Sequence, residues 1–234
     1  MKVILWIVGL VLLIGGGYLV YSNYMQPTVE EKVVETQQTQ QQTSIPGGSV
    51  VTPGSYVVAT SSSQVKWAGR KPLISGYVNS GHILLSGGDI TVTDTTATGM
   101  FTLDMNTLTV DLTAKKPGKE SALQEHLKKG DFFDVTKFPT ASFKITSVTA
   151  QADSNTSFNY TVKGDLTMKG VTNEITFPAK IYMKDGSLVT EATTAIDRTK
   201  WNITFGSSNF FDNLADNAID DMVTLDFSVV ATKK

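Results

Sequence analysis

The sequence contains no cysteine, which excludes a disulfide-stapled fold, a thiolate metal site and a cysteine nucleophile. Histidine is almost as scarce: His82 and His126 are the only two, so a three-histidine metal site cannot form and a Ser-His-Asp triad has few ways to assemble. The 234 residues carry 20 basic and 22 acidic side chains, and the formal net charge of −2 argues against a nucleic-acid-binding protein. We therefore expect no metal, no cofactor, no nucleic-acid partner and no catalytic residue.

One long hydrophobic run lies near the N-terminus. Residues 3–21 are uncharged and almost wholly apolar, which is enough for a helix to cross a hydrocarbon core of about 30 Å. We predict a transmembrane anchor over residues 1–24, with a cleaved signal peptide as the alternative; the hydrophobic region of a cleaved signal is usually shorter. Lys2 precedes the run and Glu30 and Glu31 follow it, so the positive-inside rule places the N-terminus in the cytoplasm. The predicted location is the cell membrane, single-pass with the remaining chain outside, or secreted if the signal is cleaved.

The next stretch changes in composition. Residues 25–60 are rich in Gln, Thr, Ser, Pro and Gly, and they include an almost unbroken glutamine run at 37–42. Such a segment buries too little apolar surface to offset the entropy that ordering would cost. We predict a flexible tether here, and a folded domain over residues 61–234.

The predicted domain is dominated by a period of two. Val65 and Trp67 alternate with polar neighbours, Phe101 and Leu103 do the same, and five further segments up to the C-terminus repeat the pattern. Strands with one wet face are antiparallel, since a parallel sheet covered on both faces would have continuous apolar runs. The fold class is therefore all-β, with a sandwich or a closed barrel as the architecture.

One segment has a strong helical pattern. Residues 120–129 place Leu123 and Leu127 near one side, begin with an acid, end with lysines and stop at Gly130. This short helix is expected to form a lid on a barrel end rather than a crossover in a parallel sheet. Residues 209–219 form a second stretch without a strand pattern.

Three sequence blocks carry a family resemblance. Residues 126–143 read HLKKGDFFDVTKFPTASF, residues 164–172 read GDLTMKGVT, and residues 196–201 read IDRTKW. Together, in this order, they resemble the signature of the YceI family of lipocalin-like, polyisoprenoid-binding proteins. The resemblance runs from about Ser61 to Thr232 and leaves out the anchor and the tether. One position departs from it: where many members have a histidine two residues before a glycine, Asn79 stands before Gly81.

The resemblance implies an antiparallel, lipocalin-like barrel around an elongated apolar cavity that holds one isoprenoid chain, such as a polyprenyl phosphate or a quinone tail. The inward sets of the strands, rich in Phe, Leu, Ile and Met, agree with this, because a barrel of about eight strands just encloses a single ligand. At about 0.3 kcal/mol per heavy atom, each five-carbon unit contributes roughly 1.5 kcal/mol to binding. The expected partners are an isoprenoid lipid and the cytoplasmic membrane. The sequence leaves open whether the protein forms a homodimer.

Candidate residues for the cavity and its mouth are apolar side chains from the strands, the helix and the segment after it. They are Trp67, Phe101, Leu103, Leu123, Leu127, Phe132, Phe133, Phe138, Phe143, Leu166, Met168 and Phe177. The alternative is that the aromatic residues after the helix only fasten it to the barrel wall. Arg70 and Arg198 are the only arginines and the candidates for a phosphate headgroup. Arg198 follows Asp197, so a structural ion pair is the competing interpretation.

The predicted function is a binding module that carries, stores or senses an isoprenoid outside the cytoplasmic membrane. A structural or adhesive domain whose barrel is filled by its own side chains is the first alternative. A hydrolase that uses the carboxylates of Asp131, Asp134 and Asp165 as acid and base groups is the second.

Overall fold

The computed structural model describes residues 51–151 and 157–234. The predicted anchor over residues 1–24, and the predicted tether up to residue 50, lie outside the described residues. In the two described ranges, no helix is both long and apolar enough to cross a membrane. Ser44–Lys234 form one compact unit. Because the barrel closes on itself and holds its own core, we expect this segment to fold without the rest of the chain.

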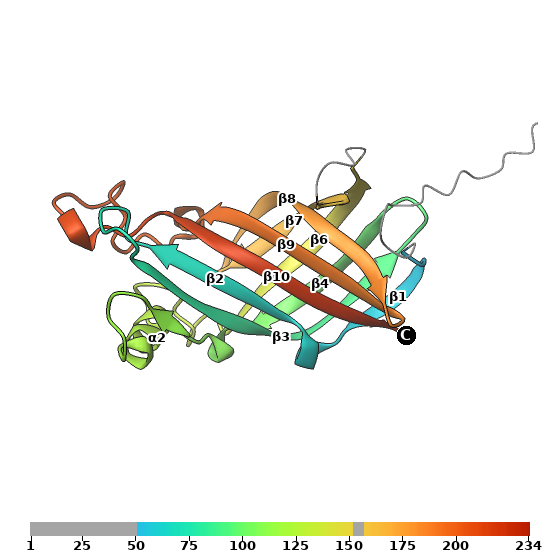
Figure 1. Cartoon of the computed structure of the whole chain (residues 1–234), viewed down its shortest axis with the longest axis horizontal. Helices are drawn as coiled ribbons and strands as arrows, with labels where there is room; N and C mark the ends of the chain where they lie inside the picture. The colour runs from blue at the N-terminus through green and yellow to red at the C-terminus, as the bar shows by residue number, and fades with distance from the viewer. Residues whose placement is uncertain (1–50, 152–156) are drawn as a thin grey trace, which may run out of the picture. The chain divides into compact units, whose positions relative to one another are not determined.

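Eight antiparallel strands form a closed barrel, which confirms the predicted all-β architecture (Figure 1). The strands are β2 (Gln64–Arg70), β3 (Val78–Val92), β4 (Ala97–Asp104), β6 (Thr140–Ala150), β7 (Tyr160–Met168), β8 (Val171–Lys184), β9 (Ser187–Asp197) and β10 (Met222–Lys233). Their order around the barrel is β10-β2-β3-β4-β6-β7-β8-β9, and pairing of β9 with β10 closes the ring. Closure leaves none of these eight strands with a long free edge.

Two short strands complete the sheet and correct one boundary. β1 (Gly54–Val58) pairs with both β10 and β3, and β5 (Leu112–Thr113) pairs with β3. The predicted tether extended to residue 60, which is wrong at its C-terminal end, because Tyr56 and Val58 in β1 are 0% and 4% exposed. A five-residue strand inside a polar stretch changes the average composition too little to be detected, although its alternation is present in the sequence.

The helix forms as the sequence predicted. Helix α2 (Glu120–Lys128) lies at the end of the barrel where β2 turns into β3 (Figure 1). Four 3-10 turns are described besides: η1 (Thr60–Ser62), η2 (Met105–Thr107), η3 (Arg198–Trp201) and η4 (Ala215–Asn217). Residues 202–221, between β9 and β10, also lie at the α2 end, since the N–H of Asp220 donates to the carbonyl oxygen of Arg70 at the end of β2. The expectation of a second segment without strands at 209–219 is therefore confirmed.

One glycine shapes the wall near α2. Gly81 on β3 faces the interior, and a Cβ there would collide with the carbonyl oxygen of Thr109 and come within 2.9 Å of the Trp67 ring. The absence of a side chain lets the segment before β5 pack directly against the barrel. The indole N–H of Trp67 donates to the same carbonyl oxygen, at 3.2 Å, and so fixes the ring on the inner wall.

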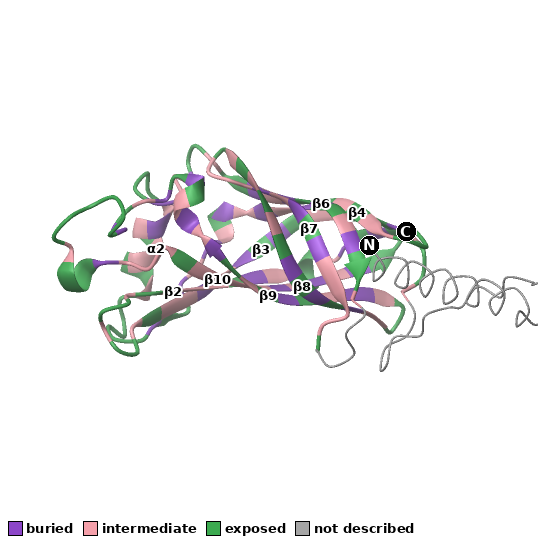
Figure 2. Cartoon of the chain, turned by 90° about the horizontal axis from the view of Figure 1, so that it is seen from above, coloured by how far each residue is buried: buried purple, intermediate pink, exposed green. Residues whose placement is uncertain are grey.

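The centre of the barrel is filled by four phenylalanine rings, which we call the phenylalanine floor. Its members are Phe101, Phe143, Phe177 and Phe227, from β4, β6, β8 and β10, and all are at most 6% exposed. Phe177 stacks on Phe227 with ring centroids 5.1 Å apart, and Phe143 lies 5.6 Å from Phe177. Figure 2 shows buried positions alternating with more exposed ones along the strands.

Candidate functional site

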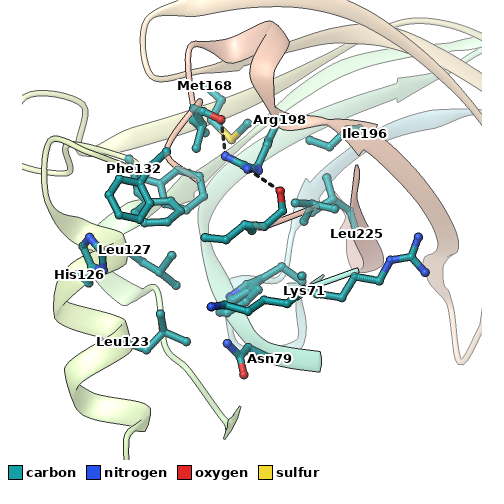
Figure 3. A pocket seen from close by; sticks show the side chains of 18 of the residues that line it. Lys71, Asn79, Leu123, His126, Leu127, Phe132, Met168, Ile196, Arg198 and Leu225 are labelled. Carbon is teal, nitrogen blue, oxygen red and sulfur yellow. Dashed lines mark hydrogen bonds between the residues drawn. The ribbon is translucent and has the colours of Figure 1, made fainter. Parts of the chain in front are cut away.

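A cavity of about 380 Å³ occupies the α2 end of the barrel (Figure 3). The strands contribute one side of its lining, whose large apolar residues are Trp67, Ile83, Met168, Ile196, Val223 and Leu225. Helix α2 and the loops contribute the other, which includes Leu123, Leu127, Phe132, Phe133, Ile203 and Phe205. The lining is thus mostly apolar, and its volume lies in the lower part of the range that small-molecule sites occupy.

The helical side of the cavity is held by aromatic contacts. Leu123 and Leu127 are four residues apart, so both project from one face of α2 (Figure 3). The ring of His126 packs edge-on against Phe132 and Phe205, at centroid distances of 5.1 and 5.0 Å, and these two rings lie 5.1 Å apart. This three-ring contact joins α2 to the segment after β9, so the two loop regions close over the cavity together.

The phenylalanine floor bounds the cavity from below. Side chains two residues apart on a strand face the same side, and Val223 and Leu225 on β10 line the cavity. The next inward residue on that strand is Phe227, which contacts Phe177 in the floor. Along β10 the cavity therefore extends over the first two inward residues, Val223 and Leu225. Beyond them the interior of the barrel is filled by side chains.

Arg198 lies in the cavity wall with its guanidinium hydrogen-bonded to the protein. Its Nε donates to the Asp220 carbonyl at 3.0 Å, and Nη1 donates to the Ile203 carbonyl at 2.6 Å. Its Nη2 donates to the Ile219 carbonyl at 3.1 Å and to the Asp221 carboxylate at 3.3 Å. Burial lowers the pKa of this guanidinium, and the Asp221 carboxylate opposes the shift. The network fastens residues 202–221 over the barrel.

The other two cations near the mouth also have partners. Arg70 Nε donates to Asp220 Oδ2 at 2.6 Å, and Lys71 Nζ donates to the Asp216 carbonyl at 3.1 Å and to Asn217 Oδ1 at 3.4 Å. Burial on its own raises the pKa of Asp220. The hydrogen bonds from the backbone N–H of Met222 and from Arg70 outweigh that effect, and the pKa of Asp220 falls below its ordinary value.

One polar side chain in the wall has unused hydrogen-bonding capacity. Asn79 lines the cavity on the inner face of β3, in line with Gly81 and Ile83. Its Oδ1 is buried and accepts no hydrogen bond from any described residue. Buried polar atoms are nearly always paired, so a buried unpaired amide oxygen needs an explanation. This is the position where the family resemblance predicted a histidine.

The structure brings eight of the predicted residues to the cavity and leaves six elsewhere. Those in the lining are Trp67, Leu123, Leu127, Phe132, Phe133, Met168, Arg70 and Arg198. Five others, Phe101, Leu103, Phe143, Leu166 and Phe177, are buried in the packed core below it. Phe138 lies over the turn at Gly170. The period of two identified inward positions correctly, but it carries no information on their height along the barrel axis.

Arg198 does form a structural ion pair, which was the competing interpretation of this residue. Its partner is not the neighbouring Asp197 but Asp221, 23 residues further along the chain. Asp197 instead accepts hydrogen bonds from the Thr199 N–H and hydroxyl, and so caps η3. Asp197 is adjacent to Arg198 in the sequence but is not its partner, because adjacent side chains of an extended chain point to opposite sides.

The carboxylates proposed for a hydrolase do not converge at the cavity. None of Asp131, Asp134 and Asp165 is in its lining. Asp131 is 3.6 Å from the imidazole of His126 with its side chain 62% exposed, and Asp165 lies on the outer face of β7 in register with Glu174. Among the described residues, no cluster of three or more His, Cys, Asp or Glu could hold a metal ion.

Several lining residues were not in the predicted set. Val223 and Leu225 belong to a strand whose alternation marked them as inward, so only their position along the barrel axis was missing. Ile83 and Ile196 lie in strands for which the sequence analysis identified no alternation at these positions. Residues 202–221 contribute Ile203, Phe205, Asn217 and Ile219 from a segment without regular periodicity. No signal in the sequence alone assigns these loop residues to the cavity.

Comparison with known proteins agrees with this architecture. A family model described as the YceI-like domain matches residues 56–231. A UPF0312 protein of Staphylococcus aureus is 38% identical over 97 residues, which cover 38% of this chain and 52% of the relative. A UPF0312 protein of Pseudomonas aeruginosa is 44% identical over 57 residues, which cover 24% of this chain and 27% of the relative. The chain thus spans about half the length, or less, of the curated relatives it matches.

Two solved structures share the fold. The crystal structure of Burkholderia cenocepacia BcnA aligns with a TM-score of 0.57 at 19% identity, over 75% of this chain and 99% of that one. A polyisoprenoid binding domain from Saccharophagus degradans, implicated in plant cell wall breakdown, aligns with a TM-score of 0.55 at 13% identity, over 78% of this chain and 100% of that one. The family match covers most of the chain, includes all three sequence blocks and coincides with the barrel. The chain belongs to the YceI family.

Proposed function

We propose that this protein binds an isoprenoid lipid in the cavity at the α2 end of its barrel. The observation that carries the proposal is the apolar cavity of about 380 Å³, enclosed by strands on one side and by α2 and its loops on the other. The polyisoprenoid-binding domain of Saccharophagus degradans, which has the same fold, supports this ligand class. At roughly 1.5 kcal/mol per five-carbon unit, two or three buried units contribute about 3 to 4.5 kcal/mol from the chain alone.

The protein acts as a binding module rather than an enzyme. The lining contains no Asp or Glu, so a carboxylate acid–base pair does not face the lipid among the described residues. A bound isoprenoid instead gains from leaving water, which needs shape and apolar surface only. Carriage, storage and sensing of the lipid all fit this chemistry.

The proposal extends to the location of the barrel. The apolar run at residues 3–21 anchors the chain in the cytoplasmic membrane, and the barrel lies outside it. Alkaline washing of membranes, followed by N-terminal sequencing of the retained protein, tests both points. An intact N-terminus in the washed membranes is expected; a shortened protein in the soluble fraction would favour signal cleavage.

The experiment that tests ligand binding is native mass spectrometry of the full chain, released gently from its own membranes, with solvent extraction of bound material. One isoprenoid per chain is expected. A ligand-free mass, from protein that also fails to bind added polyprenyl lipids, would favour the alternative of a structural domain whose barrel is filled by its own side chains.

A matched pair of variants locates the site. Val223→Phe adds a ring on the inner face of β10 within the lining, whereas Thr224→Phe adds the same ring on the outer face one residue away. Loss of the bound lipid is expected for Val223→Phe alone. Equal retention by both variants would place the ligand elsewhere.

A further inference from the structure

We infer that the cavity selects isoprenoids with a neutral, hydroxyl-bearing headgroup over those with a phosphate. The inference rests on the proposed function and concerns the polar end of the same ligand. It follows from how the protein uses each cation in the cavity wall, and from Asn79, a neutral polar side chain there whose buried amide oxygen has no partner among the described residues.

Arg198 is the best-placed cation, because it is only 4% exposed and lies in the wall itself. All three of its guanidinium nitrogens already donate, to three backbone carbonyls and to Asp221 Oδ1. Four of the five guanidinium N–H groups are thus used, so a bidentate phosphate would have to displace at least one of these bonds and leave a buried acceptor without its donor. Arg198 therefore stabilises residues 202–221 and is not free to hold an anion.

The cations at the rim offer little more. Arg70 is paired with Asp220 at 2.6 Å and its side chain is 64% exposed, so a phosphate there would be bound largely in water, where a charge pair contributes little. Lys71 donates to Asp216 and Asn217 from residues 202–221. The carboxylates of Asp220 and Asp221 beside these cations also add negative charge that repels an anion.

His126 and Tyr77 are the remaining ionisable side chains in the lining. The Nε2 of His126 lies 3.6 Å from Asp131 Oδ2, and its ring is packed edge-on between Phe132 and Phe205. The His126 imidazole thus already faces a carboxylate. The three cations and His126 are therefore each paired within the protein.

A phosphate in this cavity would be costly, since an ion that leaves water without a dedicated partner loses its hydration. A hydroxyl costs far less, and Asn79 can meet it. The amide of Asn79 lines the cavity beside Leu123 and Lys71 (Figure 3). Its Oδ1 is buried and has no partner among the described residues, so it reaches a hydroxyl when the amide turns toward the cavity. Because a hydroxyl both donates and accepts, it can pair with the amide in either orientation.

The test compares three ligands with one fifteen-carbon chain: farnesol, farnesyl monophosphate and farnesene, which has no polar head. Affinities for the segment 44–234 are measured by displacement of a fluorescent lipid probe. We expect farnesol to bind at least tenfold tighter than farnesyl monophosphate. Equal or tighter binding of the phosphate would overturn the inference while leaving the proposed function intact, whereas failure of all three to bind would overturn both.

One variant tests whether the side chain of Asn79 contacts the headgroup. Asn79→Leu removes the amide at nearly constant volume, and it is expected to weaken farnesol about fivefold while leaving farnesene within twofold. An equal loss for both ligands would mean that Asn79 only shapes the wall, and no loss for farnesol would exclude the contact. The comparison of farnesol with its phosphate is made on the unchanged sequence, so it holds even if the variant folds poorly.

Discussion

The two halves of the barrel are built from the same strands but differ in what fills them. The mouth half, at the α2 end, encloses a cavity of about 380 Å³. The closed half, on the other side of the phenylalanine floor, is packed by Tyr56, Val58, Ile90, Ala179, Leu188 and Ala231, none more than 6% exposed. Strand β1 adds a further layer of pairing there by bridging β10 and β3. Side chains thus fill the closed half, whereas the mouth half encloses an open space.

The mouth half combines polar scaffolding with the hydrophobic core, which extends there to Leu127, Phe132 and Ile203. The guanidinium of Arg198 binds three backbone carbonyls and Asp221, and the loops close over the cavity through the rings around His126. This arrangement keeps the walls in place without filling the space between them. The predictions that follow test the difference between the halves.

The largest effect is expected from the phenylalanine floor. Phe177→Ala removes a ring that contacts Phe143 and Phe227 and is 4% exposed, and it should lower the free energy of unfolding by about 3–5 kcal/mol. Leu225→Ala, which only widens an existing cavity, should cost about 1–2 kcal/mol. Urea denaturation of the segment 44–234 measures both. Similar costs for the two changes would mean that the mouth half is packed as tightly as the closed half.

The next effect concerns the polar scaffold. Arg198→Met should lower the free energy of unfolding by about 3 kcal/mol, because it leaves three buried carbonyl oxygens without their donor and removes the ion pair with Asp221, whose Oδ2 still accepts from Ser207 and Asn209. Arg70→Met is the matched control. It removes an exposed pair and should cost at most about 1 kcal/mol. A small loss for Arg198→Met would show that residues 202–221 are held by other contacts.

A third prediction uses ligand length to probe the floor. The cavity of 380 Å³ has room for about ten to fifteen carbon atoms, if each takes roughly the 30 Å³ of a liquid water molecule. Affinity should therefore rise about tenfold per five-carbon unit up to fifteen carbons and then level off. Titration with alcohols of ten to forty carbons measures this. A continued rise beyond twenty carbons would mean that the floor opens and the closed half admits the chain.

The smallest effect is a pH dependence at the mouth. The pKa of Asp220 is lower in the folded chain than in the unfolded one, so its contribution to stability is fully present above its ordinary pKa. The contribution is lost as pH falls toward the lowered pKa of the folded state. The loss should be under about 1 kcal/mol because the partner, Arg70, is exposed. Unfolding curves between pH 2 and pH 6 should show a shallower acid loss for Asp220→Asn than for the unchanged chain.

The sequence was sufficient for the architecture but not for the position of the cavity. Alternating Val65–Trp67 and Phe101–Leu103, the capped helix at residues 120–129 and the three family blocks all predicted the barrel and its end helix. Alternation predicts only which face of the sheet a side chain occupies. Phe177 and Leu225 therefore have the same pattern in the sequence, although Phe177 packs in the phenylalanine floor and Leu225 lines the cavity. Their difference depends on strand register and tilt, which are set by pairing with other strands.

Two further features depend on contacts between distant residues. The partner of Arg198 lies 23 positions away in a segment without periodicity, and β1 is a short strand at the end of a polar stretch. Asn79 was visible only as a departure from the family pattern. Its unpaired amide oxygen in the cavity wall is a property of the folded chain.

The most direct test of this account asks which half of the barrel the lipid enters. Met168 lines the cavity, whereas Met183 packs in the closed half near the β8–β9 turn, so two methyl groups report on the two halves. The segment 44–234, labelled with ¹³C at its methionine methyl groups, is titrated with farnesol and followed by NMR. We predict that the Met168 signal shifts to saturation at one equivalent while the Met183 signal stays in place. A shift of Met183 as large as that of Met168, or no shift of either, would contradict the account.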